Sequence, residues 1–319
     1  PCLIDSHETI NWLLEGDPSV RYQVFRDLLS KSDEEIEKAQ RTIATSGWGR
    51  KLLNLQDEKG LWGGGLYSPK WISTHYTLLT LKLLGLHPDN GQGKKAAQLL
   101  LDKGYYRDGG INFFVSMKNS ETCVTGMVLS MVSWFNLNDN RVHDLARHLL
   151  GQQMGDGGWN CNAYLGHTHS SFHTTISVLE GLQNYSMYVN GMSNEIVEAR
   201  EKAHEFLLQH HLFRSHRTGE VFDQRMTRFS FPPRWRYDIM RALDYFALIH
   251  HPHDPRFCDA IQILKKKEKN GRWPTQSHHA GREYFILEKA GEPGRINTLR
   301  ALRILNWWKE KAAVKGNCH

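Results

Sequence analysis

Five polar residues occupy equivalent places in five apolar segments of the sequence. Each lies near the start of a segment whose spacing is typical of a buried helix. If these helices run parallel, their first turns meet at one end of the array. Histidine, cysteine, aspartate and glutamate are the residue types that ligate zinc, and Glu121 lies two residues before the cysteine. The five residues are His75, Cys123, His173, Asp238 and Asn297.

The same residue types also have structural explanations. Asp and Asn are favoured at the start of any helix, and a single cysteine is often a small buried apolar residue. The pattern therefore predicts a metal site but leaves the structural alternative open. His75 and Asp238 have three roles open to them: fourth metal ligand, general acid or base, or a residue that orients a ligand.

Arginine and aromatic residues gather around these positions. Guanidinium groups, together with six parallel helix N-termini, favour a carboxylate, phosphate or diphosphate group. An aromatic-lined cavity with a few polar groups is the usual form of a small-molecule site. We therefore expect a hydrophobic or aromatic substrate that carries an anionic group. The expected substrate-binding residues are Arg234, Arg236, Arg295, Tyr76 and Phe172, and the expected catalytic residues are Asp238, His75 and Tyr237.

A glycine–tryptophan motif recurs along the chain and defines the elements that must hold these residues. The segments 56–62 and 153–159 both read Gln-x3-Gly-x-Trp, and 267–273 has Lys in place of Gln. Weaker copies surround Gly109 and Gly219, so the period is about 50 residues, which indicates an array of repeats. Each glycine follows a charged amphipathic segment and precedes a loop and a more apolar segment. Each repeat therefore predicts a hairpin of two helices, with its tryptophan in a structural role.

The alternation of polar and apolar helices predicts a closed double ring. An amphipathic helix buries one face, whereas an apolar helix needs neighbours on most sides. We predict a single all-α domain, an (α/α)6 toroid over residues 1–319, and an open solenoid is the alternative. Residues 1–32 form a helix pair, about 33–311 the five repeats, and 312–319 a tail. Apolar inner helices are expected at 73–86, 120–135, 171–185, 234–249 and 295–308, and outer segments at 33–56, 94–102, 141–153, 194–211 and 256–268.

Composition excludes several classes of protein. The chain is 40% hydrophobic and 23% charged, which excludes a disordered or collagen-like chain, and no apolar run is long enough to cross a membrane. The net charge is +6, but the only dense basic run is Lys265–Lys267, so we expect a small-molecule partner and no nucleic acid. The five cysteines are scattered without a Cys-x-x-Cys pair, which predicts reduced thiols and a cytoplasmic protein.

The repeats resemble those of terpenoid cyclases of the squalene–hopene type and of the β subunits of protein prenyltransferases, over residues from about 33 to 308. These β subunits hold zinc with Asp-x-Cys at the start of one inner helix and His at the start of the next. Glu121-Thr122-Cys123 is similar to the first element, with Glu for Asp, and the segment 173–182 is similar to the second. The resemblance implies Zn²⁺ held by Glu121, Cys123 and His173, and it allows for a partner subunit.

Several functions remain open after this resemblance. The sequence lacks the Asp-x-Asp-Asp motif of squalene–hopene cyclases, and Asp238 is the acid nearest the expected site. We expect a zinc-dependent enzyme of this superfamily that catalyses transfer, hydrolysis, or elimination and cyclisation. The alternatives are a metal-free cyclase or isomerase with Asp238 as acid, and a non-catalytic toroid that binds a lipid or a partner. A saccharide lyase or glycosidase that uses Asp223 and Asp238 is a weaker alternative.

Overall fold

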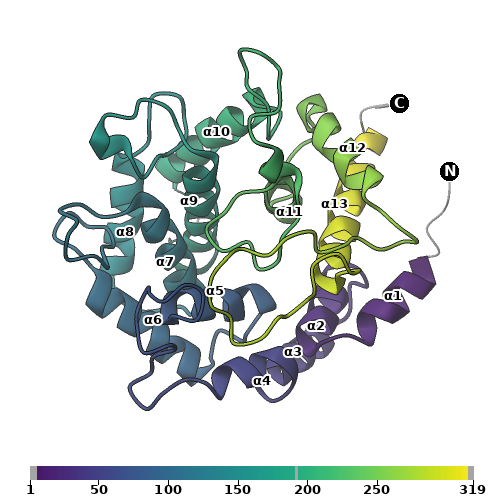
Figure 1. The fold of residues 1–319 in the computed structure, drawn as a ribbon, viewed down its shortest axis with the longest axis horizontal. Helices are drawn as coiled ribbons and strands as arrows, with labels where there is room; N and C mark the ends of the chain where they lie inside the picture. Colours follow the sequence, from purple (N-terminus) through teal and green to yellow (C-terminus); the bar gives the residue numbers. More distant parts are fainter. Residues whose placement is uncertain (1–5, 191–192, 315–319) are drawn as a thin grey trace.

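The helices form two concentric rings (Figure 1), and the all-α toroid predicted above is confirmed. The computed structural model describes residues 6–190 and 193–314, and in this part of the chain the regular structure is helical. The inner ring contains α2 (Pro18–Asp27), α5 (Thr74–Leu84), α7 (Thr122–Trp134), α9 (Phe172–Tyr185), α11 (Ile239–Leu248) and α13 (Arg295–Val314). The outer ring contains α1 (Ser6–Leu14), α3 (Asp33–Arg41), α4 (Gly47–Leu53), α6 (Gly91–Gly104), α8 (Asn140–Gly151), α10 (Asn194–Gln209) and α12 (Cys258–Lys266).

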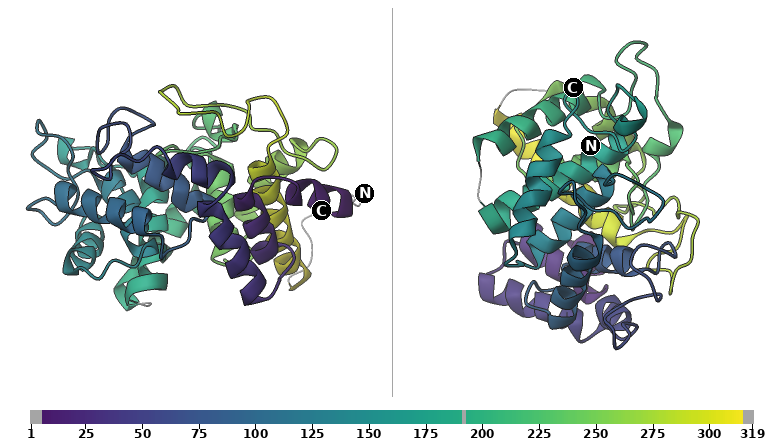
Figure 2. Two further views of the ribbon diagram at one scale, coloured as in Figure 1. Left: turned by 90° about the horizontal axis from the view of Figure 1, so that it is seen from below. Right: turned by 90° about the vertical axis from the view of Figure 1, so that its left-hand side faces the viewer.

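Short helical turns and long loops complete the rings. Contacts of α13 with both α11 and α2 join the last repeat to the first. The loops that precede the inner helices lie together on one side of the molecule (Figure 2), and we call this side the mouth. The 3-10 turns are η1 (Thr42–Ala44), η2 (Ala163–Leu165), η4 (Gln224–Thr227) and η5 (Pro255–Phe257), and η3 (Ser186–Asn190) is a π-helical turn.

The repeat tryptophans are structural, as predicted. Trp62, Trp159 and Trp273 are fully buried. Each indole N–H donates to a leucine carbonyl near the end of the preceding outer helix, at 2.7–2.8 Å. Each tryptophan backbone N–H donates to a threonine hydroxyl in the first turns of the next inner helix, at 2.9–3.0 Å. One residue therefore fixes the outer helix, the loop and the inner helix of its own hairpin.

Removing one of these threonine hydroxyls is expected to destabilise the fold. In Thr175→Val the shape of the side chain is kept, but the buried Trp159 N–H loses its acceptor. A buried donor without a partner costs about 1–3 kcal/mol, so the free energy of unfolding falls by that amount. Urea denaturation measures it. Thr168→Val on an exposed loop is the control and should change the free energy of unfolding by less than about 0.5 kcal/mol. Equal effects of the two substitutions would contradict this role.

Several predicted boundaries are wrong, for local reasons. The segment 33–56 is two helices, because Gly47 adopts φ +63° and a Cβ there would lie 2.1 Å from Asp17 Oδ2. Asp17 instead accepts the Trp48 N–H at 2.7 Å. Helix α11 begins at Ile239 and not at 234, since two prolines and a positive φ at Arg234 precede it.

Other boundaries differ by a few residues. Helix α7 begins after Glu121, not Ser120, and α13 extends to Val314, into the predicted tail. Residues 315–319 of that tail lie outside the described residues. In the ranges 6–190 and 193–314, no helix combines the length and the hydropathy required for a membrane span.

Candidate functional site

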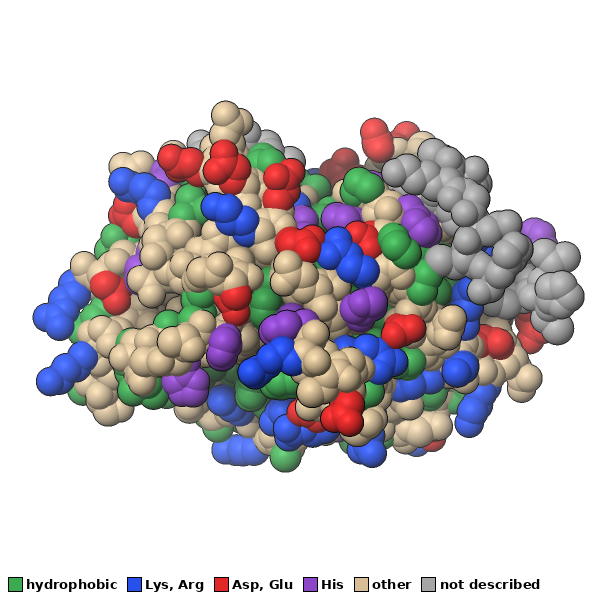
Figure 3. All heavy atoms as spheres, turned by 90° about the horizontal axis from the view of Figure 1, so that it is seen from above, with side chains coloured by type: hydrophobic (Ala, Val, Ile, Leu, Met, Phe, Trp, Pro, Cys, Tyr) green, Lys and Arg blue, Asp and Glu red, His purple; other side chains and the backbone are tan. Residues whose placement is uncertain are grey.

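A polar cavity of about 240 Å³ lies at the mouth, beside the N-terminal ends of α9 and α11. Its walls come from the first turns of these helices and from the loops 223–238 and 277–280. Many Lys and Arg side chains lie along the lower edge in Figure 3, which is the side that faces the viewer in Figure 1. Most of the residues that line the cavity are polar or charged, unlike the aromatic residues that the sequence predicts for its lining. The lining residues are His173, Asp223, Arg225, Met226, Arg228, Ser230, Arg236, Tyr237, Asp238, Ser277, His278, His279 and Ala280.

Asp238 is the buried acid of this cavity, as the sequence predicts for the mouth. It caps α11 by accepting the Arg241 N–H at 2.8 Å. Although Asp238 lines the cavity, the residue is only 2% exposed. Burial raises the pKa of Asp238, while Arg300 and the hydrogen bonds from Arg241 and Ser230 oppose that rise. A carboxyl group in this state holds its proton to higher pH than an exposed aspartate, which suits a general acid.

Ser230 connects Asp238 to a histidine. The Ser230 N–H and hydroxyl both lie 3.3 Å from Asp238 Oδ2, and Ser230 Oγ lies 3.0 Å from His279 Nε2. Burial, with Arg236 and Arg234 nearby, lowers the pKa of His279 to about 4, so the ring is neutral at pH 7. The three side chains form a hydrogen-bonded chain that can move a proton along the cavity wall.

Arg236 offers positive charge to the cavity and forms no ion pair with another residue in 6–190 or 193–314. Its Nε is buried and has no hydrogen-bond partner, while its guanidinium group stacks 4.7 Å from the Trp235 ring centre. By contrast, the Arg225 guanidinium lies 2.7 Å from the Asp223 carboxylate on the same wall. A buried donor that lacks a partner is costly, so Arg236 is poised for an anionic ligand.

His173 and Tyr237 form another part of the wall. The Tyr237 N–H donates to His173 Nδ1 at 2.8 Å, so the second ring nitrogen of His173 is the one left for a ligand. Burial lowers the pKa of His173 to about 4, and Arg241 and Arg236 add to this. The Tyr237 hydroxyl donates to the Leu212 carbonyl at 2.6 Å, which makes this tyrosine a packing residue with its hydroxyl already engaged.

An aromatic arc flanks the polar cavity. We define it as Tyr67, Trp71 and Trp235, whose ring centres lie 5.5–5.9 Å from the Lys70 ammonium group. Trp71 donates to the His279 carbonyl at 3.0 Å, and Trp235 packs against His173 with ring centres 5.1 Å apart. The arc therefore adjoins the cavity on two sides, with Tyr67 and Trp71 buried and Trp235 partly exposed.

The three predicted zinc ligands are not gathered around one point. Glu121 ends the loop before α7, and burial raises the pKa of its carboxyl group. The Cys123 N–H donates to Cys161 Sγ at 3.1 Å, and His173 is held by Tyr237. Across residues 6–190 and 193–314, no three His, Cys, Asp or Glu side chains lie close enough to share a metal ion. This geometry does not fit a preformed zinc site, and zinc binding stays a prediction.

Other predicted site residues lie away from the cavity. His75 is fully buried among Tyr67, Tyr76 and Phe113, and burial lowers its pKa to about 3. The hydroxyl of Tyr76, which is fully buried, donates to that of Tyr67 in the aromatic arc at 2.7 Å.

The remaining three predicted binding residues have structural partners. Arg234 pairs with Glu283 at 2.8 Å and lines a narrow neighbouring cavity. Arg295 donates to the Trp12 carbonyl at 3.0 Å and stacks on the Trp12 ring, toward the outer ring. Phe172 packs on Phe206, Phe222 and Tyr237, is only 4% exposed and does not line the cavity. We therefore assign these three residues to the fold.

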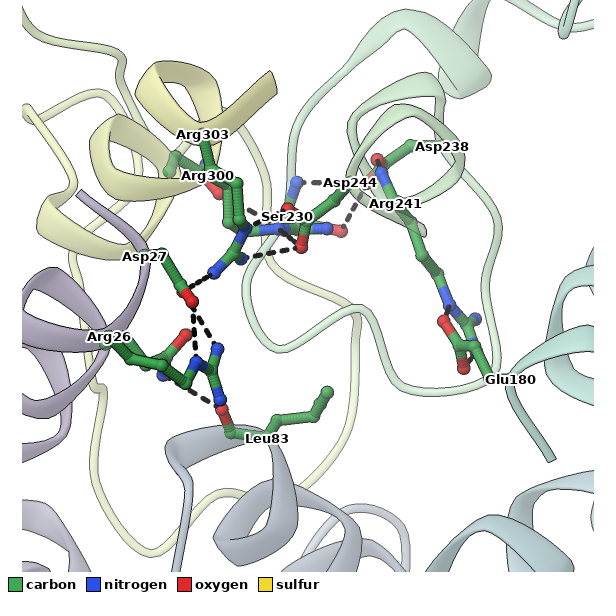
Figure 4. Close-up of polar contacts among 12 residues, drawn as sticks. Arg26, Asp27, Leu83, Glu180, Ser230, Asp238, Arg241, Asp244, Arg300 and Arg303 are labelled. Atoms are coloured by element: carbon green, nitrogen blue, oxygen red, sulfur yellow. Dashed lines mark hydrogen bonds and ion pairs between the residues drawn. The ribbon is translucent and has the colours of Figure 1, made fainter. Parts of the chain in front are cut away.

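Buried ion pairs link neighbouring inner helices (Figure 4). Arg241 of α11 pairs with Glu180 of α9 at 2.7 Å. Asp244 of α11 binds two arginines of α13, Arg300 at 3.1 Å and Arg303 at 2.8 Å. Arg303 also pairs with Asp27 of α2, so the network links three inner helices.

Sequence reasoning missed Ser230, His279, Lys70 and Cys161. All four lie on loops, where no helical period marks the direction of a side chain. The adjacent pair His278 and His279 was the one available signal, because two histidines in a loop next to an arginine-rich end of the toroid are a reasonable candidate for a site.

Comparison of the sequence with protein families gives no match, and comparison with curated proteins gives none either. Among solved structures, the chain is similar to type II terpene cyclase MstE from Scytonema without ligand, with a TM-score of 0.45 and 17% identity over 94% of this chain and 89% of that chain. Two ligand complexes of substituted forms of that cyclase each give a TM-score of 0.46.

The complex with the substrate geranylgeranyl dihydroxybenzoate is 16% identical, over 93% of this chain and 88% of that one. The complex with the product merosterolic acid A is 18% identical, over 94% and 88%. At such low identity, neither the residues nor the substrate of the cyclase transfer to this chain.

Proposed function

We propose that this protein is an acid–base enzyme that binds a small anionic molecule at the mouth and protonates it from Asp238. The observation that carries the proposal is the hydrogen-bonded chain of Asp238, Ser230 and His279 on the wall of the cavity. Asp238 is buried and its pKa is raised by that burial, so it is the group suited to donate a proton. The neutral His279 can then receive a proton from solvent and return it through Ser230.

The charge and shape of the cavity indicate how the substrate would lie. Arg236, with its buried Nε free, would bind a carboxylate, phosphate or diphosphate group. A cavity volume of about 240 Å³ accommodates that head group. An apolar or aromatic remainder would lie against the aromatic arc, which adjoins the cavity. Protonation of an unsaturated bond in that remainder would begin an isomerisation or cyclisation.

The proposed reaction does not use zinc. The three expected ligands do not gather in the described part of the chain, whereas the proton relay needs residues that already touch. The identity of the substrate is tested with a panel of candidate compounds. We would incubate the purified protein with geranylgeranyl diphosphate and geranylgeranyl dihydroxybenzoate, with and without EDTA, and analyse the products by mass spectrometry.

The anion-binding part of the proposal predicts the effect of Arg236→Gln. The change removes the charge and leaves a shorter polar side chain. A charge-assisted hydrogen bond contributes about 1.5–3 kcal/mol, so the Kd for an anionic probe should rise about 10- to 100-fold. Isothermal titration calorimetry with inorganic diphosphate and with benzoate measures it.

Arg295→Gln is the matched control for this titration, because Arg295 contacts Trp12 and does not line the cavity. Its Kd should equal that of the parent protein. A Kd that is unchanged in Arg236→Gln, or that rises equally in both variants, would show that the anion binds elsewhere.

A further inference from the structure

Two cysteines from separate repeats meet at the mouth. Cys123 lies in the first turn of α7, and Cys161 lies in the loop that precedes α9. The Cys123 N–H donates to Cys161 Sγ at 3.1 Å, so the sulfur of one cysteine lies against the backbone of the other. Both are free thiols and both are only partly buried. The sequence gives no sign of this pair, since 37 residues separate the two cysteines.

The surroundings hold the Cys161 sulfur in place. The Thr174 hydroxyl, in the first turn of α9, lies 3.5 Å from Cys161 Sγ, and the Cys161 N–H donates to Thr174 Oγ1 at 3.3 Å. Cys161 Sγ is therefore contacted by groups from the N-terminal turns of two inner helices. Such donors stabilise negative charge on a sulfur atom. Because Cys161 Sγ already lies 3.1 Å from the Cys123 nitrogen, a bond between the two sulfur atoms needs little movement of the backbone.

We propose that Cys123 and Cys161 are a dithiol redox site, which a low-molecular-weight disulfide converts into an intramolecular disulfide. The Cys161 sulfur attacks one sulfur of the reagent and releases one thiolate. The Cys123 sulfur then attacks Cys161 in the mixed disulfide and releases the second thiolate. One disulfide bond breaks in the reagent and one forms in the protein. Two electrons pass to the reagent, and the two thiol protons balance the two thiolates.

This site is separate from the proton relay. The cysteines are not among the residues that line the polar cavity, and the reaction needs neither Asp238 nor an anionic ligand. The new bond would tie the first turn of α7 to the loop before α9, beside Glu121. The inference therefore goes beyond the proposed function, and each can fail without the other.

The test uses the full-length protein, treated with EDTA, in buffers with increasing ratios of oxidised to reduced glutathione. After acid quenching, free thiols are alkylated and the unreduced protein is digested with trypsin. Arg141 and Arg147 separate the peptide Asn119–Arg141 from the peptide His148–Arg200, so a bond between the two cysteines joins two peptides. We expect the joined peptide to accumulate with the loss of two of the five cysteine thiols.

Three variants make the assignment specific. Cys161→Ser and Cys123→Ser should each abolish the joined peptide, whereas Cys258→Ser on the outer helix α12 should leave it unchanged. Circular dichroism shows whether each variant is folded. If a variant does not fold, the joined peptide in the parent protein is the result that tests the proposal. The proposal is overturned if Cys123 and Cys161 remain alkylated at the most oxidising ratio, or if each carries glutathione without a joined peptide.

Discussion

Replacing Asp238 by asparagine is expected to lower turnover about 10²- to 10⁴-fold, the usual contribution of a positioned general acid. The asparagine carbonyl can still accept the Arg241 N–H and cap α11, so the helix should stay in place. What is lost is the proton that the carboxyl group donates. Product formation by the parent and by Asp238→Asn, on whichever panel substrate turns over, measures the effect, and thermal unfolding measures the stability.

The pH dependence follows from the raised pKa of Asp238. A general acid works only when protonated, so the rate should fall as the pH rises through this pKa. The free energy of unfolding is expected to fall over the same rise in pH. Because the folded state binds the proton more tightly than the unfolded state, the stabilisation from protonated Asp238 is lost as the pH rises through the folded pKa. Asp238→Asn lacks this step, so its stability relative to the parent should increase with pH above about 4.

Asp223→Asn is the matched control for this substitution. Asp223 lines the same cavity, but its hydrogen bond from Arg225 lowers the pKa, so at neutral pH it has no proton to donate. We expect its turnover to change by less than about 10-fold. Full activity in Asp238→Asn, or an equal loss in both variants, would remove Asp238 from the role of acid.

Asp244→Ala should cause the largest loss of stability among the changes considered. Its carboxylate binds the Arg300 and Arg303 guanidinium groups, and those two residues are only 6% and 8% exposed. Without Asp244, the side-chain hydrogen bonds left to these two arginines within the described residues are that of Arg300 to Asn297 and that of Arg303 to Asp27. Removing one partner from a buried ion pair typically costs about 3–5 kcal/mol in free energy of unfolding.

Urea denaturation of Asp244→Ala and of a surface control, Asp89→Ala, distinguishes the effect of a buried ion pair from the effect of losing one negative charge. Asp89→Ala removes an aspartate of the same charge, whose carboxylate pairs with Lys94 on the surface. We expect it to cost at most about 1 kcal/mol. If Asp244→Ala costs no more than this control, the ion pairs between the inner helices do not stabilise the ring.

The toroid could be predicted because its evidence is local and repeated. In each strong repeat the tryptophan and a threonine make the same contact inside their own hairpin, so a pattern read along the chain reports directly on the structure. The break at Gly47 could not be predicted in this way. It depends on Asp17, which is distant in sequence and accepts the N–H of Trp48.

The site was predicted less well than the fold. Equivalent positions in parallel helices indicate how far along the ring axis a residue lies, but they do not indicate toward which side of its helix the side chain points. Asp238 and His173 face the cavity, whereas Phe172, one residue before His173, packs toward the outer ring. His75 shares the same level and is enclosed by aromatic rings. Ser230 and His279 come from loops, whose conformation depends on contacts between repeats that a single sequence does not display.

The most direct measurement of the central claim is turnover in D₂O. If Asp238 protonates a carbon of the substrate through a relay open to solvent, the product of the parent protein should carry one solvent deuterium and should form equally well after EDTA treatment. Asp238→Asn should form little of this product. Product without deuterium, or activity that EDTA abolishes and zinc restores, would contradict the account and favour zinc chemistry at Glu121, Cys123 and His173.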